Sequence, residues 1–477
     1  MVKGGYPLQN QTKVFDLIII GSGPGGYLPA ILFAQKELSV AIIEKADLGG
    51  TCLNRGCIPS KALLKEAKLW DDIKKSGSVR DKNEANGFFQ RAMEKKDAAV
   101  NQVVSGLRNL LNRERITVMN GEASFTGPRT LEVKRDGRRA ERVKADRILI
   151  ASGAVWDEQP ELRRDGKWIL WTDDVLRMGD LPLTLAIVGG GRAGVEFATF
   201  FNTFGVKVTL IEKENRILPK MDREISIRYR VLLTKNNIKV LTETAVVASE
   251  ISREGSFVNL KVVQKGKEEK LEVQKVLVTG NRRGNVDGLD LGKAPLNLKD
   301  GFLPVDLHMK TSVPGIFAAG DVVGKGFFAH KAFQEGRTAV ENMTGKECHI
   351  NYRLIPNCLY AHPEAASLGL TEEEAKSECG DAAIGKFPFM ACGQSIATGN
   401  QEGMVKIISE KKYGEILGVH ILGPHATELI HLGAMAMKHE IGVEEIKQMI
   451  FAHPTFSEAF FEAALDTHGE AIHMTKG

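Results

Sequence analysis

One pattern of apolar and polar residues occurs twice along the chain. Residues 14–20 form a β-branched apolar run that leads into a glycine-rich turn, a helical stretch over 27–36 and a second apolar run at 39–43. Residues 185–188 begin the same series, which ends in an apolar run at 206–211. Short apolar runs that flank a helical stretch are typical of parallel β-strands, so each copy predicts a βαβ unit.

Each turn between strand and helix carries three glycines in the spacing Gly-x-Gly-x-x-Gly. They are Gly21, Gly23 and Gly26 in the first copy and Gly189, Gly191 and Gly194 in the second. The first glycine makes the tight turn, the second lets the backbone approach a pyrophosphate, and the third lets helix and strand pack closely. The helix N-terminus then offers free N–H groups to the phosphates. The pattern therefore predicts two dinucleotide-binding sites.

An acidic residue follows the first glycine by 23 positions in both copies, Glu44 in the first and Glu212 in the second. Each is expected to accept hydrogen bonds from a ribose. A carboxylate at this place disfavours a 2′-phosphate, so Glu212 indicates NAD rather than NADP. Lys213 and Arg216 lie nearby and weaken that preference slightly.

The rest of the chain changes character along its length. Residues 61–112 are charged and helical, and residues 246–278 read as short strands joined by charged turns. The last 120 or so residues mix alternating segments, such as 404–408 and 416–421, with an amphipathic helix at 426–438. We therefore predict an α/β protein with two Rossmann-like dinucleotide-binding domains and a C-terminal α/β domain of its own.

Composition excludes several classes of protein. The chain has 477 residues, of which 43% are hydrophobic and 26% charged, which is enough apolar material for sizeable cores. A net charge of +4, evenly spread, predicts no nucleic-acid partner. No run of 18 apolar residues occurs and the N-terminus is polar, so we expect no membrane span, no signal peptide and a cytoplasmic location.

Six cysteines are too few for a disulfide scaffold, but Cys52 and Cys57 form a close pair. Residues five apart on a regular helix have Cα atoms about 8–9 Å apart, and a disulfide needs less than about 7 Å. If the two are bonded, the helix must be distorted, for which Gly56 and Pro59 are suitable residues. The alternative is two unrelated buried cysteines. Because Cys-x4-Cys is not a usual zinc spacing, no metal site is predicted.

Residues 49–61 resemble the active-site motif of the flavoprotein disulfide reductases, the class I pyridine nucleotide-disulfide oxidoreductases. The Leu-Asn-Arg-Gly interior and the Pro-Ser-Lys ending are similar to the members that oxidise dihydrolipoyl groups. Residues 311–321 and 329–332 resemble the second FAD motif and its continuation, and residues 453–458 resemble the C-terminal signature. The resemblance covers nearly the whole chain.

The resemblance implies that the first βαβ unit binds FAD, the second binds NAD, and the chain acts as a homodimer. It implies four domains, which are an FAD-binding part at 1–158, an NAD-binding domain at 159–285, a central domain at 286–353 and a dimerisation domain at 354–477. The partners that it implies are lipoyl domains of 2-oxo acid dehydrogenase or glycine cleavage complexes.

The resemblance also implies roles for four reactive residues. Cys52 would form the mixed disulfide with substrate, and Cys57 would be the thiol next to the flavin. His453 would be the base that deprotonates the substrate thiol, oriented by Glu458. In the family this His–Glu pair acts on the disulfide of the partner subunit.

Other positions would hold the cofactors. Lys61 would lie near the flavin and pair with Glu196. Taken without the family, both would read as exposed helix charges. The remaining cofactor contacts that the resemblance implies are Thr51, Ala123, Asp321 and Ala329 for FAD, and Val246 and Gly280 for NAD.

Two departures from the family pattern bear on the coenzyme. Arg192 stands inside the second glycine turn, where the family often has an apolar or tyrosine residue, and residues 280–285 differ from the usual dehydrogenase segment. Two alternatives also stay open: a reductase of another disulfide on the same scaffold, and a non-catalytic flavoprotein subunit. Retention of Cys52, Cys57, His453 and Glu458 together argues against the second.

Overall fold

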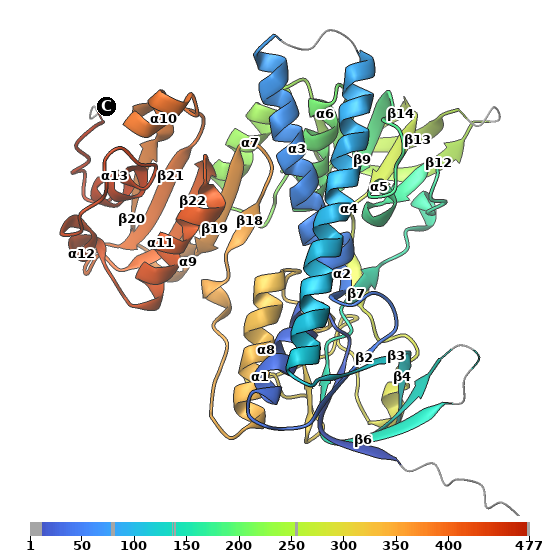
Figure 1. Ribbon diagram of the computed structural model, residues 1–477. Helices are drawn as coiled ribbons and strands as arrows, with labels where there is room; N and C mark the ends of the chain where they lie inside the picture. Colours follow the sequence, from blue (N-terminus) through green and yellow to red (C-terminus); the bar gives the residue numbers. More distant parts are fainter. Residues whose placement is uncertain (1–11, 78–81, 136, 138–139, 253–255, 475–477) are drawn as a thin grey trace, which may run out of the picture. The chain divides into compact units, whose positions relative to one another are not determined.

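The computed structural model describes residues 12–474 except 78–81, 136, 138–139 and 253–255 (Figure 1). The chain divides into two compact units. The first consists of Met1–Ser60, Lys95–Asp157 and Asn281–Asn351, and the second of Lys61–Glu94, Glu158–Gly280 and Tyr352–Gly477. None of the described helices is long and apolar enough to cross a membrane.

The first unit is built on a seven-stranded sheet with the order β3-β2-β1-β6-β5-β4, in which β17 also pairs with β6. Its strands are β1 (Lys13–Ile20), β2 (Val40–Glu44), β3 (Thr117–Asn120), β4 (Glu122–Gly127), β5 (Thr130–Lys134), β6 (Glu141–Ile150) and β17 (Ile316–Ala318). Strand β1 runs parallel to both β2 and β6. Its last four residues are buried, as the apolar run predicts.

Helices α1 (Pro24–Ala34) and α8 (Ala329–Met343) pack side by side in the same unit (Figure 1). A Cβ added to Gly336 would lie 2.4 Å from Cγ of Pro29, so glycine permits this close approach. The unit also contains the short helix α2 (Gly50–Arg55) and the two-stranded pairing of β7 (Ala154–Trp156) with β16 (Arg282–Gly284).

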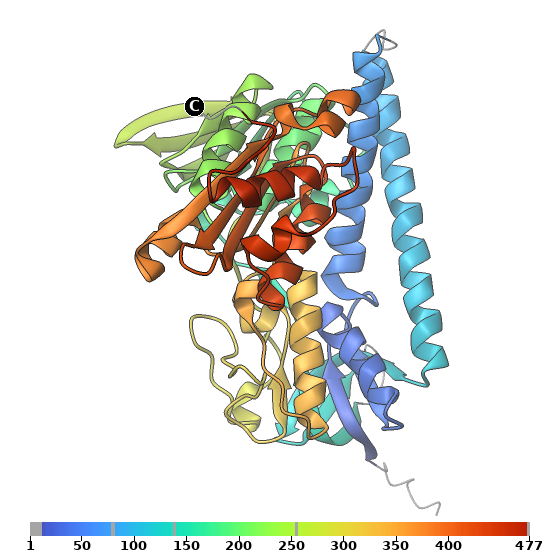
Figure 2. The ribbon, with the colours of Figure 1, turned by 90° about the vertical axis from the view of Figure 1, so that its left-hand side faces the viewer.

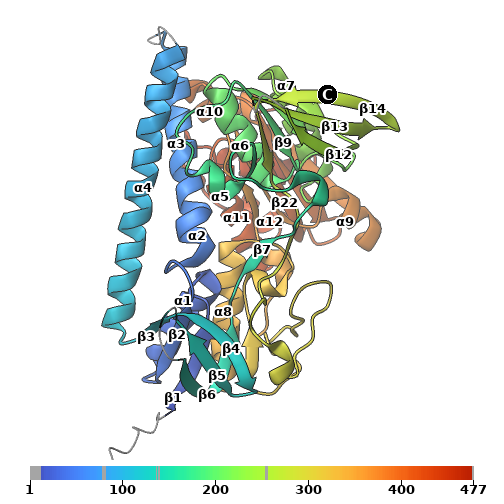
Figure 3. The same ribbon diagram turned by 90° about the vertical axis from the view of Figure 1, so that its right-hand side faces the viewer.

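The second unit contains a parallel sheet with the order β11-β10-β9-β15-β8. Its strands are β8 (Ile169–Trp171), β9 (Thr184–Val188), β10 (Lys207–Ile211), β11 (Lys239–Leu241) and β15 (Lys275–Val278). The helices that belong to it are α5 (Thr172–Val175), α6 (Arg192–Thr203) and α7 (Arg223–Lys235). Strands β12 (Thr244–Ile251), β13 (Val258–Gln264) and β14 (Lys267–Val273) form an antiparallel sheet, labelled in Figure 3.

The C-terminal part of the second unit is an antiparallel sheet with the order β18-β19-β22-β21-β20. Its strands are β18 (Asn357–Leu359), β19 (Glu364–Gly369), β20 (Ala382–Pro388), β21 (Met404–Glu410) and β22 (Ile416–Gly423). Its helices are α9 (Glu372–Cys379), α10 (Gly393–Thr398), α11 (Ala426–Lys438), α12 (Val443–Lys447) and α13 (Glu458–Asp466). Helices α11 and α13 cover one face of this sheet, as the red helices over orange strands in Figure 2 show.

Two long helices, α3 (Cys57–Lys75) and α4 (Lys82–Arg113), account for the charged helical stretch that the sequence predicts. Within the second unit, the rings of Trp70 on α3 and Phe88 on α4 lie 5.0 Å apart between centroids, and Trp70 stacks on Phe204 at 6.2 Å.

The predicted fold class is therefore confirmed. Both βαβ units form, with the helices beginning at Pro24 and Arg192, directly after the second glycine of each turn. The four predicted domain boundaries stay a prediction.

Candidate active site

The first glycine turn joins β1 to α1 in the first unit. Gly21 has a φ of 99°, a left-handed conformation that favours glycine, and a Cβ on Gly26 would lie 2.0 Å from the carbonyl oxygen of Gly21. Helix and strand therefore pack as closely as the third glycine predicts. A Cβ on Gly23 would meet no atom within 4 Å. The middle glycine thus leaves free space in front of the helix N-terminus.

The second turn repeats this geometry between β9 and α6. Gly189 has a φ of 110°, a Cβ on Gly194 would lie 1.8 Å from the carbonyl oxygen of Gly189, and a Cβ on Gly191 would meet nothing within 4 Å. Turn, close packing and free space thus fall on the same three positions as in the first copy.

The predicted acids close each turn by accepting backbone N–H groups. Oε2 of Glu44 accepts from the N–H of Ser22 at 2.8 Å, and Oε1 accepts from the N–H of Ala46 at 2.8 Å. In the second copy, the same two oxygens of Glu212 accept from Gly190 at 2.6 Å and from Glu214 at 2.9 Å.

Both turns fit a dinucleotide. The open space at the second glycine and the helix N-terminus behind it form a cradle that a Cβ would fill, which is the form that pyrophosphate binding requires. The acids are held at the strand ends with 8% exposure for Glu44 and 7% for Glu212. The chain's own residues therefore fit FAD and NAD as cofactors.

The cysteine pair lies where the helical path is broken. Helix α2 ends at Arg55, Gly56 takes a non-helical φ of −138° and ψ of −103°, and α3 begins at Cys57. A disulfide joins Cys52 to Cys57, whose Cα atoms are 4.7 Å apart. The expected distortion is therefore present, and Gly56 supplies it. Pro59 lies in the first turn of α3, where proline is tolerated.

Lys61 and Glu196 meet within the second unit. Nζ of Lys61 lies 3.1 Å from Oε2 of Glu196, whose side chain is 10% exposed. Tyr360 supports both, because its backbone N–H donates to Oε1 of Glu196 at 3.0 Å and its ring centroid lies 4.3 Å from Nζ of Lys61. Glu196 is thus a buried, ion-paired acid rather than the exposed helix acid that spacing alone suggests.

His453 and Glu458 form the predicted pair at the start of α13. Nδ1 of His453 lies 2.8 Å from Oε1 of Glu458, and the N–H of Thr455 donates to Oε2 at 2.8 Å. Partial burial acts to raise the pKa of the Glu458 carboxyl, but the hydrogen bonds from His453 and Thr455 outweigh it and hold that pKa below its usual value. Because an ionised carboxylate only accepts, Nδ1 carries the hydrogen and Nε2 is left as the basic nitrogen.

The remaining predicted cofactor contacts are spread over both units. In the first unit, Thr51 lies in α2, Ala123 is buried in β4, Asp321 follows β17 and Ala329 begins α8. Asp321 also faces Arg282, with 3.7 Å between Oδ2 and Nη1.

In the second unit, Val246 lies in β12 and Gly280 lies two residues after the end of β15. A Cβ on Gly280 would lie 2.6 Å from Nε2 of Gln159, so a side chain there would displace the Gln159 amide.

Arg192, the departure inside the second turn, is the first residue of α6. Its guanidinium Nη1 donates to the carbonyl oxygen of Cys358 at 3.4 Å. Burial raises the pKa of the Cys358 thiol to about 11, and the nearby Arg192 charge opposes that rise. Arg216 likewise has partners outside the turn, because it pairs with Glu373 at 3.3 Å.

Two supporting groups escape sequence reasoning. Tyr360 lies 164 positions after Glu196, and no local signal marks it. Lys331 and Glu335 are an i,i+4 pair just after the second FAD motif, a spacing that does favour an ion pair. Both are fully buried, and Nζ of Lys331 donates to the carbonyl oxygens of Gly320 and Gly324 at 3.1 and 2.8 Å. The pair therefore fixes the turn that carries Asp321.

Comparison with known families gives two matches that together span most of the chain. The model described as pyridine nucleotide-disulphide oxidoreductase matches residues 15–336. The model described as the dimerisation domain of pyridine nucleotide-disulphide oxidoreductase matches residues 355–464.

Individual relatives agree with these matches. A dihydrolipoyl dehydrogenase of Bacillus subtilis (strain 168) is 37% identical over 470 residues, which cover 96% of this chain and 99% of the relative. A dihydrolipoyl dehydrogenase of Thermus scotoductus is 36% identical over 476 residues, with coverages of 97% and 99%. The crystal structure of LpdA from Mycobacterium tuberculosis superimposes with a TM-score of 0.87 at 23% identity and covers 95% of this chain and 99% of that one, which supports the fold.

Proposed function

The chain belongs to the pyridine nucleotide-disulphide oxidoreductase family, and from this premise we propose that it is a dihydrolipoyl dehydrogenase. It would oxidise protein-bound dihydrolipoyl groups to the lipoyl disulfide and reduce NAD⁺. The observation that carries the proposal is the disulfide between Cys52 and Cys57 at the helix break, in a chain that also builds both dinucleotide turns. Relatives named dihydrolipoyl dehydrogenase match this chain over nearly their full length, which supports this substrate.

FAD and NAD are the cofactors of the chain. In our proposal the turn at Gly23 and the acid Glu44 hold FAD, and the turn at Gly191 and the acid Glu212 hold NAD. When bound, FAD supplies the two-electron carrier that links the dithiol to NAD⁺. Side chains of this protein carry out the thiol–disulfide exchange and the proton transfer.

The chemical step is a thiol–disulfide exchange in two parts. One thiol of the dihydrolipoyl group loses its proton and attacks Sγ of Cys52, which breaks the bond to Cys57 and forms a mixed disulfide. The second substrate thiol then attacks the substrate sulfur of that mixed disulfide, which releases the lipoyl ring. Two electrons and two protons have then left the substrate, and both cysteines are reduced. Overall, the dithiol and NAD⁺ give the lipoyl disulfide, NADH and one proton.

His453 supplies the base. A thiol attacks only as its thiolate, and a histidine can remove the proton near neutral pH. Glu458 fixes Nδ1, which leaves Nε2 as the basic nitrogen of a side chain that is 76% exposed. A base this exposed within one subunit fits a site that a second subunit completes, and residues 355–464 match a dimerisation domain. We therefore propose a homodimer in which His453 serves the disulfide of the partner subunit.

Lys61 and Glu196 play a positioning role in this proposal. Glu196 holds the Lys61 ammonium in place, and burial raises the pKa of the Tyr360 hydroxyl to about 12, so the ring beside it stays uncharged. A fixed positive charge is the kind of group that stabilises negative charge on a reduced flavin.

The direct test measures NADH formation by the FAD-loaded protein with dihydrolipoamide and NAD⁺. We expect turnover that Cys52→Ser abolishes and that His453→Gln lowers by roughly 10²–10⁴-fold, the range of general-base catalysis. Cys379→Ser, at an exposed free cysteine, is the matched control. If dihydrolipoamide gives no turnover while NADH still reduces the flavin, the substrate is another disulfide. If NADH does not reduce the flavin either, the result favours the alternative of a non-catalytic flavoprotein subunit.

Subunit complementation tests the dimer. Neither Cys52→Ser nor His453→Gln homodimers retain a complete site. Co-expressed in equal amounts, the two variants give half heterodimers, each with one complete site, so about a quarter of the wild-type activity returns if the histidine acts across the interface. No recovery in purified heterodimers would place base and disulfide in the same subunit.

A further inference from the structure

A row of polar side chains crosses the whole C-terminal sheet. One residue of each strand takes part, and each is the register partner of the next, in the order Asn357, Ser367, His420, Lys406 and Lys386. Residues next to them in sequence, such as Cys358 and Val419, belong to the apolar core on the opposite face. The row is therefore confined to the face away from that core.

The lysine end of the row is fully paired. Lys406 is 1% exposed, and its Nζ lies 2.9 Å from Oδ1 of Asp222 and 2.7 Å from Oε2 of Glu372. Burial acts to lower the pKa of Lys406, but the hydrogen bonds to these carboxylates outweigh it and raise that pKa. Lys386 pairs with Glu224 at 2.7 Å. This end needs no further partner.

The other end is not satisfied. Among the described residues, Oδ1 of Asn357, Oγ of Ser367 and Nδ1 of His420 are buried without a hydrogen-bond partner. Nε2 of His420 lies 3.0 Å from the carbonyl oxygen of Leu370, so Nε2 carries the hydrogen. Burial lowers the pKa of His420, which keeps the ring neutral and leaves Nδ1 as a bare acceptor. Nδ1 and Oδ1 both require donors, and Oγ can accept or donate.

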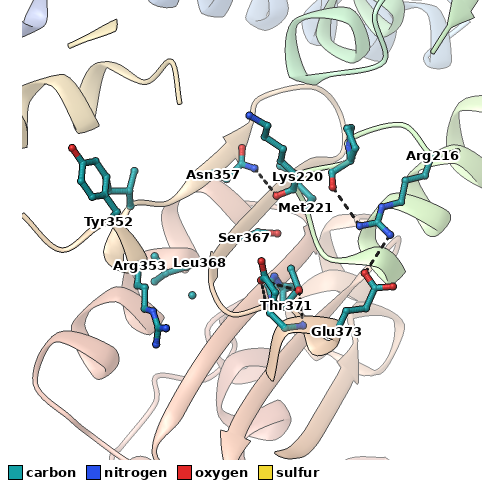
Figure 4. A pocket seen from close by; sticks show the side chains of 15 residues that line it. Arg216, Lys220, Met221, Tyr352, Arg353, Asn357, Ser367, Leu368, Thr371 and Glu373 are labelled. Carbon is teal, nitrogen blue, oxygen red and sulfur yellow. Dashed lines mark hydrogen bonds and ion pairs between the residues drawn. The ribbon is translucent and has the colours of Figure 1, made fainter. Parts of the chain in front are cut away.

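These three residues line one cavity of about 300 Å³, whose rim carries cations (Figure 4). Arg216, Lys220 and Arg353 lie at the rim, and Glu373 and Glu374 also line the cavity. Arg216 shares Glu373 with Arg223, at 3.3 and 3.5 Å, and Arg353 pairs with Glu378 at 2.8 Å. Within the described part of the chain, Lys220 makes no ion pair.

We propose that this cavity binds a small anion that also carries hydroxyl groups, such as a phosphorylated polyol or a hydroxycarboxylate. The acid group would lie by Arg216 and Lys220, and hydroxyl groups would donate to the acceptors of His420 and Asn357. An anion without hydroxyl groups would leave the acceptors of Asn357 and His420 without donors. A neutral polyol would not use the cations at the rim. At about 300 Å³ the cavity lies at the lower end of small-molecule sites, too small for a dinucleotide.

Calorimetric titration of the FAD-loaded protein tests the proposal, with saturating NAD⁺ present so that the second glycine turn is filled. The probes are glycerol 3-phosphate, L-malate and inorganic phosphate. We expect saturable binding, one per chain, of one of the two hydroxylated anions, and at least about tenfold weaker binding of inorganic phosphate. Whether glycerol 3-phosphate or malate binds separates the two sources of this chemistry. No saturable heat with either would show that the cavity holds only water and would overturn the proposal.

Matched variants locate the binding. Arg216→Gln and Ser367→Ala should each weaken binding about tenfold, whereas Arg223→Gln should not, because Arg223 shares Glu373 but does not line the cavity. If Ser367→Ala fails to fold, as judged by circular dichroism and thermal unfolding, Asn357→Leu replaces it. Equal affinity in Arg216→Gln and Arg223→Gln would move the binding elsewhere and overturn the assignment.

Discussion

The turn at residues 21–26 and the turn at residues 189–194 use the same backbone construction with different surroundings. Both have a left-handed first glycine, a third glycine packed against the first, and an acid that accepts two backbone N–H groups. The first turn also has the Ser22 hydroxyl, which donates to Glu44 at 2.6 Å and accepts the N–H of Gly49 at 3.0 Å. The second has Gly190 there, where a Cβ would lie 2.9 Å from Cβ of Glu212.

This difference separates the positions that any dinucleotide-binding turn requires from those that connect one turn to its neighbouring segments. The shared positions are those at which a side chain would clash or a backbone group would lose its partner. The differing positions connect each turn to its neighbours. Through Gly49, which precedes the first residue of α2, the first turn is hydrogen-bonded to the segment that carries Cys52. The second has Arg192, which donates to the Cys358 carbonyl.

The largest expected effect comes from the third glycines. Gly26→Ala and Gly194→Ala each place a methyl group within 2.0 and 1.8 Å of a backbone carbonyl oxygen, which should destabilise its own unit by about 1–3 kcal/mol. Gly26→Ala should lose flavin absorbance per chain. Gly194→Ala should keep the flavin and lose saturation by NAD⁺. Gly106→Ala on α4, where a Cβ meets nothing within 4 Å, is the control. Full flavin content in Gly26→Ala would break the parallel between the turns.

The acids should come next. Glu212→Gln puts an amide NH₂ where a carboxylate oxygen accepts a backbone N–H, and it removes the charge that disfavours a 2′-phosphate. The ratio of kcat/KM for NAD⁺ over NADP⁺ should fall by about tenfold. Glu44→Gln should leave that ratio unchanged and speed FAD release. Glu214→Gln, an exposed neighbour, serves as the comparison. An unchanged ratio in Glu212→Gln would mean that this carboxylate does not select the coenzyme.

A smaller effect is expected from the serine that only the first turn has. Ser22→Ala removes hydrogen bonds to Glu44 and from Gly49, which should cost about 1 kcal/mol in the free energy of unfolding. Denaturant unfolding with FAD bound measures it. Ser39→Ala is matched, because that hydroxyl also donates to a carboxylate, Asp16, at 2.6 Å and accepts a backbone N–H, that of Asp16, at 2.9 Å, but at an exposed site. Equal losses in the two variants would show that burial of the Ser22 hydroxyl adds nothing to its two hydrogen bonds.

The smallest effect should come from Arg192. Its hydrogen bond to the Cys358 carbonyl is long, at 3.4 Å, so Arg192→Gln should change stability by no more than about 0.5 kcal/mol. Accordingly, KM for NAD⁺ should change by less than about threefold. A much larger rise in KM would instead show that the guanidinium contacts the coenzyme phosphates.

Much of this architecture follows from the sequence because it rests on local rules. The glycine spacing, the acid 23 positions later and the amphipathic helix at Ala426–Lys438 are each set within a few dozen residues. The break between Cys52 and Cys57 follows from geometry only if the two are bonded, and of the two residues suited to it, Gly56 and Pro59, the structure shows that Gly56 supplies it.

Long-range partners do not follow in this way. No residue near Lys61 in the sequence indicates its contact with Tyr360. The polar row of the C-terminal sheet likewise depends on a strand order in which β22 lies between β19 and β21. Single polar residues in apolar strands, such as His420 in β22, look like isolated exceptions until the register puts them side by side.

The Ser22 hydroxyl has one more consequence, which is that the second turn cannot fully replace the first. If the six residues at 189–194 were grafted in place of 21–26, the backbone could close in the same way, because both glycine frames match. The graft would, however, leave the N–H of Gly49 without its acceptor at the start of the segment that holds the cysteines. Such a chimera would keep the backbone of the turn but lose its Ser22–Gly49 hydrogen bond to the segment that carries Cys52 and Cys57.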